Sequence, residues 1–85
     1  MISGDVFVTP HAVRQFISRI APQLDYDEAL WAIIHELRDH GGEPKPLESG
    51  RGIRVRTRGG RYSFRAVIAP GDPQPVVVTV LRSGR

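Results

Sequence analysis

The sequence of 85 residues contains no cysteine, a single lysine and no long apolar run. Without cysteine the chain has neither disulfides nor thiolate chemistry, which is typical of proteins in reducing compartments. No apolar run approaches the ~20 residues of a membrane-spanning helix, and the N-terminus lacks the basic and apolar regions of a signal peptide. We therefore expect a cytoplasmic protein without membrane contact, folded as one domain over residues 1–85.

Motifs for metal binding and for nucleophilic catalysis are also absent. His11, His35 and His40 are scattered, and the last two are five residues apart rather than the four of a helical ligand pair. No Ser-His-Asp arrangement or nucleophile elbow is found. Gly50 and Gly52 precede a predicted strand rather than a helix, unlike a phosphate-binding glycine loop. We expect neither a metal nor a cofactor.

Charge is divided unevenly along the chain. Residues 1–50 hold four basic and eight acidic side chains, whereas residues 51–85 hold eight arginines and one acidic side chain, Asp72. A concentrated positive field of this kind attracts phosphate backbones, and an acidic segment does not. The second half of the chain is therefore the expected site of any contact with a polyanion.

The first half begins with a short alternating segment, Val6 to Val8, that fits an edge strand. Thr9 and Pro10 are typical of the N-cap and first position of a helix, which we expect to run to about Ile20. The residues at the spacing of a core-facing stripe are Val13, Phe16, Ile17 and Ile20.

A second helix is predicted between Asp25, which forms a capping-box pattern with Glu28, and the Gly41–Gly42 pair. Its core-facing stripe comprises Tyr26, Leu30, Ile33, Ile34 and Leu37. Trp31 lies on a second stripe, with His35 and Arg38. Both partial burial of Trp31 where the helix meets the sheet and a role as a stacking platform or partner contact are open.

Residues 52–69, GIRVRTRGGRYSFRAVIA, alternate throughout and predict a β-hairpin. A two-residue turn at Gly59–Gly60 places Arg54 opposite Arg65 and Arg58 opposite Arg61. One face then collects Ile53, Val55, Thr57, Tyr62, Phe64 and Ala66, and the other Arg54, Arg56, Arg58, Arg61, Ser63 and Arg65. Opposed like charges destabilise a sheet, and a bound polyanion would relieve the repulsion. The alternative is that the arginines simply extend into solvent.

The remaining segments are a mobile connection at 41–52, a turn at 70–75 and a third strand at 76–82. Pairing this strand antiparallel to residues 62–68 places Thr79 opposite Arg65, so that Arg54, Arg65 and Thr79 become neighbours. The residues that then face the core are Val76, Val78 and Val80. This is the preferred register. The pattern does not exclude a shift of one residue, which places Val77 with the core residues and Thr79 on the apolar face, because Val77 and Leu81 are also apolar.

Two helices followed by strands predict an α+β fold, with the two N-terminal helices packed on one face of a three- to four-stranded antiparallel sheet. The arginine face is left open. Its Arg, Thr and Ser side chains, with His11 as an acid or base, suit phosphate recognition. They also suit RNA cleavage, in which the ribose 2′-OH attacks the adjacent phosphate and cationic donors stabilise the developing charge. The helical position of His11, opposite its core stripe, argues against its reaching this face.

Three segments, VTPHAVRQFISRI, YDEALWAII and the closing VVVTVLR, resemble small bacterial and phage proteins of the RelE/BrnT-like toxin superfamily. The similarity is to an uncharacterised branch with a His-Ala-x-x-Arg opening helix, and it covers residues 8–81. It implies α+β ribonucleases or RNA-binding toxins whose basic sheet face meets RNA, often paired with an acidic antitoxin. It points to His11 and Arg14 in the opening helix, to Thr79 in the closing strand, and to Arg65 as the central cation. The C-terminal LRSGR lacks a catalytic Tyr or His.

We therefore predict a small toxin-like RNA-binding protein, with endoribonuclease activity as a further hypothesis. The catalytic candidates are His11, Arg65 and Thr79. The candidates for RNA or phosphate binding are Arg14, Arg54, Arg56, Arg58 and Arg61. The alternative is a non-catalytic interaction protein of phage origin whose arginine face binds an acidic protein. A third hypothesis is a homodimer with a seam of Val67, Val77 and Leu81.

Overall fold

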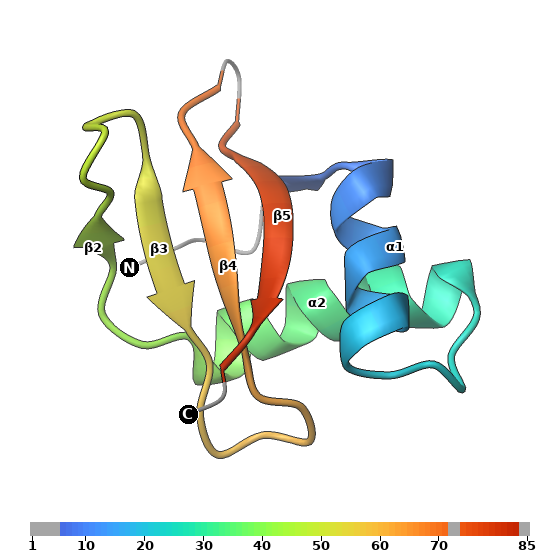
Figure 1. Cartoon of the computed structure of the whole chain (residues 1–85). Helices are drawn as coiled ribbons and strands as arrows, with labels where there is room; N and C mark the ends of the chain where they lie inside the picture. The colour runs from blue at the N-terminus through green and yellow to red at the C-terminus, as the bar shows by residue number, and fades with distance from the viewer. Residues whose placement is uncertain (1–5, 72–73, 84–85) are drawn as a thin grey trace.

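The structure is a computed structural model that describes residues 6–71 and 74–83. It is an α+β fold with two helices and a five-stranded mixed sheet in the order β1-β5-β4-β3-β2 (Figure 1). The elements in chain order are β1 (Phe7–Val8), α1 (Pro10–Arg19), α2 (Tyr26–His40), β2 (Lys45–Pro46), β3 (Ile53–Arg56), β4 (Phe64–Ala69) and β5 (Val76–Arg82). The α+β class is confirmed, whereas the prediction of three to four antiparallel strands is corrected at both edges of the sheet.

At one edge, β1 is an edge strand as predicted, but it runs parallel to β5, with Phe7 beside Val76 and Val8 beside Val77. At the other edge, β2 pairs antiparallel with β3 through Lys45 and Arg54. Residues 41–52 are therefore not simply a connection. The turn expected at 70–75 includes positions 72 and 73, which lie outside the described residues.

Both helix starts are set by local capping, as the sequence predicts. The Thr9 hydroxyl accepts a hydrogen bond from the Ala12 N–H at 3.1 Å. The Asp25 carboxylate accepts from the Glu28 N–H at 2.8 Å, and the Glu28 carboxylate accepts from the Asp25 N–H at 2.9 Å, which completes the capping box. Over residues 6–71 and 74–83, neither helix has the length and apolar character needed to cross a bilayer.

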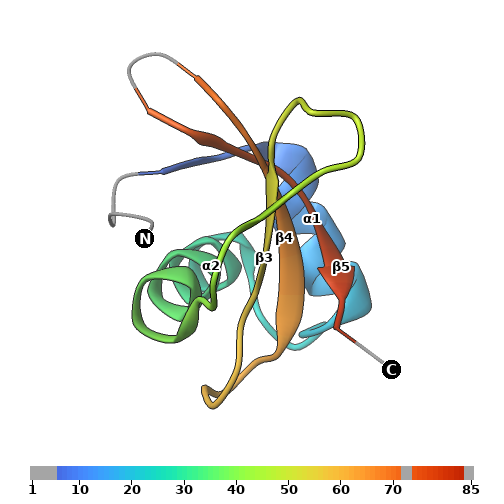
Figure 2. The same ribbon diagram turned by 90° about the vertical axis from the view of Figure 1, so that its left-hand side faces the viewer.

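The core lies between the helices and one face of the sheet, and it is centred on Phe16 of α1. The Phe16 ring contacts Phe64 and Tyr62 edge-to-face, with ring centroids 5.2 and 5.4 Å apart. In Figure 2 the sheet is seen nearly edge-on, with α2 on one side of β3 and β4. The other fully buried or nearly buried side chains include Ala12, Val13, Ala29, Ile33, Leu37, Val55, Ala66, Ile68, Val77 and Val80.

Two aromatic residues of α2 are more exposed than predicted. Tyr26 was expected in the core stripe but is 42% exposed, because it is the first residue of α2 and lies at the end of the helix. Of the two possibilities that the sequence leaves open for Trp31, its exposure of 57% argues against partial burial where the helix meets the sheet. Its ring contacts His35 one turn along, with centroids 5.5 Å apart. The alternative roles as a stacking platform or partner contact remain hypotheses.

The β3–β4 hairpin keeps the predicted faces but not the predicted register. Arg56 pairs with Arg65 and Arg54 with Val67, a shift of two residues from the expected pairing of Arg54 with Arg65. A shift of two preserves which face each side chain occupies. The expected two-residue turn is replaced by a wider loop over residues 58–63, closed where the Thr57 N–H donates to the Phe64 carbonyl at 2.9 Å.

The wider loop is held by a buried carboxylate from α2. Glu36 is 8% exposed, and its Oε2 accepts hydrogen bonds from the backbone N–H groups of Arg61 at 3.0 Å and Tyr62 at 3.4 Å. Gly59 has φ +82°, in the left-handed region that favours glycine. Gly60 lies so close to Glu36 that a Cβ there would overlap its Oε1 atom. A tight turn at Gly59–Gly60 would not present the amides of residues 61 and 62 to this carboxylate.

β5 satisfies neither of the two predicted registers over its whole length. Ala66 pairs with Val80 and Val67 with Thr79, but Ile68 pairs with Val77, because a bulge makes Val78 an extra residue. Val77 and Val80 are both fully buried, whereas Val78 is 39% exposed. Thr79 therefore does not lie opposite Arg65, and Arg54, Arg65 and Thr79 do not form the expected row.

Substitution of Gly60 by Ala tests the contact with Glu36. We expect Gly60→Ala to lower the free energy of unfolding by about 1–3 kcal/mol, because the added methyl group must displace a buried, hydrogen-bonded carboxylate. In a Glu36→Ala background the same substitution should cost less, with a coupling free energy of at least ~0.5 kcal/mol. Urea denaturation of the wild type, the two single variants and the double variant measures this coupling free energy. Strict additivity would show that Glu36 does not determine the loop.

Candidate functional site

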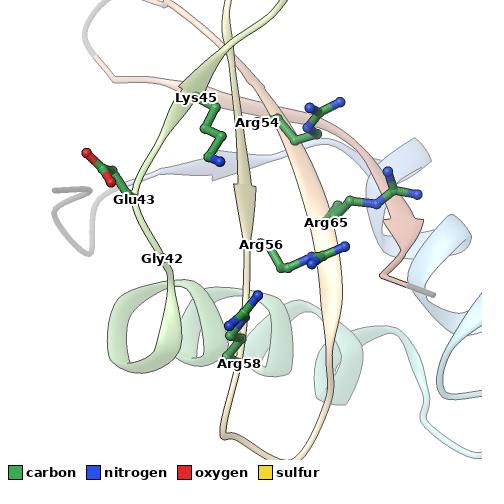
Figure 3. Close-up of a pocket in the computed structure, with 7 residues that line it drawn as sticks. All are labelled: Gly42, Glu43, Lys45, Arg54, Arg56, Arg58 and Arg65. Carbon is green, nitrogen blue, oxygen red and sulfur yellow. The ribbon is translucent and has the colours of Figure 1, made fainter. Parts of the chain in front are cut away.

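The face of the sheet opposite the helices carries a group of cationic side chains around one cavity. The cavity has a volume of about 320 Å³, and Gly42 and Glu43 complete its lining. We call the five cations the cationic patch; they are Lys45, Arg54, Arg56, Arg58 and Arg65. Figure 3 shows the arginines of β3 and β4 extending from the side of the sheet away from α2, while the Glu43 carboxylate points away from them.

Strand pairing explains why these charges are adjacent. Lys45 of β2 lies directly across from Arg54, and Arg56 of β3 lies directly across from Arg65 of β4. Directly opposed like charges destabilise an antiparallel pair by a few tenths of a kcal/mol or more. The patch therefore retains a local electrostatic cost that a bound anion would reduce.

Two of the guanidinium groups are held by neutral acceptors at the end of β5. The Arg65 Nε donates to the carbonyl oxygen of Arg82 at 3.0 Å. The Arg56 Nη2 donates to the carbonyl oxygen of Ser83 at 3.2 Å. A carbonyl orients a guanidinium without cancelling its charge, and each guanidinium has five N–H donors. Within the part of the chain that the structure describes, most donors of Arg56 and Arg65 thus remain for another ligand.

The patch is accessible from solvent. Lys45, Arg54, Arg56 and Arg58 are exposed, and Arg65, between β3 and β5, is half-buried. Partial burial of Arg65 lowers the local screening of its charge, so its interaction with an anion would be stronger than that of a fully exposed side chain. Arg65 is therefore the central cation of the patch by position as well as by exposure.

The structure gathers only some of the predicted site residues. Arg54, Arg56, Arg58 and Arg65 line the cavity together. The predicted residues that do not line it are His11 and Arg14, both exposed on α1, Arg61 in the 58–63 loop, and Thr79, which pairs with Val67. The expected Arg65–Thr79 pair is replaced by Arg65 and Leu81.

The proposed dimer seam is also divided by the bulge in β5. Val67 and Leu81 are half-buried and share the outer face with Arg65, but Val77 is fully buried in the core. A seam that requires Val77 at the surface is therefore wrong. A homodimer built on other residues stays a prediction.

Lys45 and Gly42 were missed because their segment gave no periodic signal. β2 has only two residues, and two residues cannot display strand alternation. The Gly42 N–H donates to the Arg56 carbonyl at 2.8 Å, which brings residues 42–45 alongside β3. Such a pairing between distant segments is not visible in local sequence.

The charged side chains that line the cavity are mostly cations. The lining includes no imidazole and only one carboxylate, that of Glu43. Among residues 6–71 and 74–83, no group of three or more His, Cys, Asp or Glu side chains is arranged to hold a metal ion. The arrangement is suited to binding an anion with several negatively charged oxygens.

An anion that binds the patch should stabilise the fold. Tripolyphosphate at ten times its dissociation constant should add about 1.4 kcal/mol to the free energy of unfolding. For a domain of this size that corresponds to a rise in Tm of roughly 6–11 °C. Differential scanning fluorimetry against sodium chloride of equal ionic strength measures the shift. An equal shift in Arg65→Ala would show that the anion binds elsewhere.

Comparison of the chain with protein-family models, with curated proteins and with solved structures finds no match in any of the three.

Proposed function

We propose that the protein binds RNA through its phosphate backbone at the cationic patch. The observation that carries this proposal is the convergence of five cations from β2, β3, the 58–63 loop and β4 on one cavity. Charge-assisted hydrogen bonds from arginine to phosphate are among the strongest polar contacts in proteins. The choice of RNA among polyanions rests on the resemblance of the helices and closing strand to RelE/BrnT-like toxins.

The spacing of the arginines favours a polymer over a single small anion. Arg54 and Arg56 are alternate residues of β3, and Arg58 continues this alternation just beyond the strand. Alternate residues of a strand are ~6.6 Å apart, so the three side chains extend over about 13 Å. This length is enough for successive phosphates of one nucleic-acid strand to meet successive arginines.

The lining of the cavity favours contact with the backbone rather than with bases. Base recognition in single strands relies on aromatic stacking and on polar side chains at base edges. No aromatic residue lines this cavity. Phe16, Phe64 and Tyr62 pack in or against the core, and Tyr26 and Trp31 belong to α2 on the other side of the sheet. Phe7, which is 50% exposed, belongs to β1 at the edge of the sheet opposite to β2 and does not line the cavity. We therefore propose binding with little sequence preference.

RNA cleavage is the part of the hypothesis that the geometry supports least. Arg56 and Arg65 are suited to stabilise charge on a phosphate, but an acid or base of suitable type is needed to move protons efficiently. His11 is exposed on α1 and is not among the residues around the cavity. Binding is accordingly the proposed function, and cleavage is measured in the same experiment.

RNA binding is tested by fluorescence anisotropy with a labelled single-stranded RNA and an RNA duplex over a range of salt concentrations. Four to five phosphate contacts predict a slope of log K against log[salt] of about −3 to −4. Arg65→Ala should weaken binding and reduce the slope by about 1. Arg14→Ala, which removes the same charge from an exposed site on α1, should leave the slope unchanged.

Gel analysis of the same RNAs after incubation measures cleavage. Absence of both salt-dependent retention and cleavage would contradict the proposed function. The alternative partner, an acidic protein, would be indicated by co-purification of such a protein that is lost on Arg65→Glu substitution. Val67 and Leu81, which lie half-buried on the same face, would give such a protein an apolar contact beside the cations.

A further inference from the structure

Arg82, the last residue of β5, belongs to the basic half of the chain but does not face the cationic patch. It pairs with Phe64, which is fully buried in the core, so strand alternation directs the Arg82 side chain to the helix side of the sheet. There its Nε donates a hydrogen bond to the carbonyl oxygen of Arg19 at 3.2 Å. The side chain thus connects the end of β5 to the end of α1.

The acceptor of this bond is a helix terminus. Arg19 is the last residue of α1, and the last four carbonyls of a helix have no partner within the helix. A cation near a helix C-terminus is also favoured by the helix dipole. Both effects stabilise the position of Arg82 relative to α1.

The backbone carbonyl groups at the same point accept hydrogen bonds from arginines of the cationic patch. The Arg82 carbonyl accepts from Arg65, and the Ser83 carbonyl accepts from Arg56. These two arginines form the directly opposed pair of β3 and β4. One short segment is therefore held by its side chain on the helix side and orients two guanidinium groups on the outer side.

We propose that Arg82 is a positioning residue for phosphate binding. By anchoring the end of β5 to α1, it holds the two carbonyls that fix the guanidinium groups of Arg56 and Arg65 before a ligand arrives. This inference rests on the proposed function of the patch. Each long side chain immobilised in advance reduces the entropy lost on binding.

The test is RNA affinity as a function of salt for Arg82→Met, which keeps an unbranched stem but removes the donor. We expect binding on the order of tenfold weaker, from the loss of order in two arginines. The salt slope should stay at the wild-type value, because no phosphate contact is removed. Arg38→Met, which removes the same charge from the exposed surface of α2, should change neither quantity.

A second measurement does not depend on RNA. In the free protein, hydrogen exchange of the Arg65 Nε–H, followed by NMR, should be faster in Arg82→Met than in wild type, because its carbonyl acceptor is no longer held. If Arg82→Met does not fold at the assay temperature, Arg82→Ile, which also lacks a donor to the Arg19 carbonyl and has a β-branched side chain that favours a strand, is measured against the same expectations.

Three results would overturn the inference: affinity of Arg82→Met equal to that of Arg38→Met, a slope reduced by about 1, or unchanged exchange at Arg65 Nε–H. A reduced slope would mean that Arg82 itself contacts phosphate. Failure of wild-type protein to bind RNA would instead contradict the proposed function, and the exchange measurement would still decide whether Arg82 orients Arg65.

Discussion

The buried carboxylate of Glu36 sets the geometry on which the cationic patch depends. By accepting hydrogen bonds from the Arg61 and Tyr62 amides, it fixes a loop over residues 58–63 instead of a two-residue turn. The length of this loop determines which residues of β3 and β4 face each other, and it places Arg56 opposite Arg65. A carboxylate on the helix side of the sheet thus determines the arrangement of arginines on the other side.

That arrangement is electrostatically unfavourable on its own. Arg56 and Arg65 are opposed, and Lys45 lies across from Arg54. The carbonyls of Arg82 and Ser83 orient the central pair without neutralising it. Within residues 6–71 and 74–83, no carboxylate forms an ion pair with these cations. An accessible face of this kind, with its central pair oriented, is better suited to bind a polyanion than one in which carboxylates already neutralise the arginines.

The sequence predicted the parts of the fold that depend on neighbouring residues. Thr9 and Asp25 begin helices because their side chains meet amides three residues away, and that pattern is local. The faces of β3 and β4 follow from alternation alone, so Arg54, Arg56 and Arg65 were assigned to one face correctly.

The remainder depends on contacts between distant segments. The hairpin register was wrong by two residues because Glu36, 25 residues from Arg61, selects the loop. The bulge at Val78 was invisible because every residue from Val76 to Val78 is a valine and fits either face. Lys45 was not predicted as a site residue because its strand, β2, has only two residues and is too short to show a pattern. Each error concerns pairing, which local sequence specifies weakly.

The central claim is that the arginines of the cationic patch, rather than those of the helices, contact phosphate. Titration of the ¹⁵N-labelled protein with an RNA oligonucleotide, observed at the arginine Nε–H resonances, tests it most directly. The account predicts shifts for Arg54, Arg56, Arg58 and Arg65, with the resonances of Arg14 and Arg38 unchanged. Shifts confined to Arg14 and Arg38, or none at saturating RNA, would contradict it.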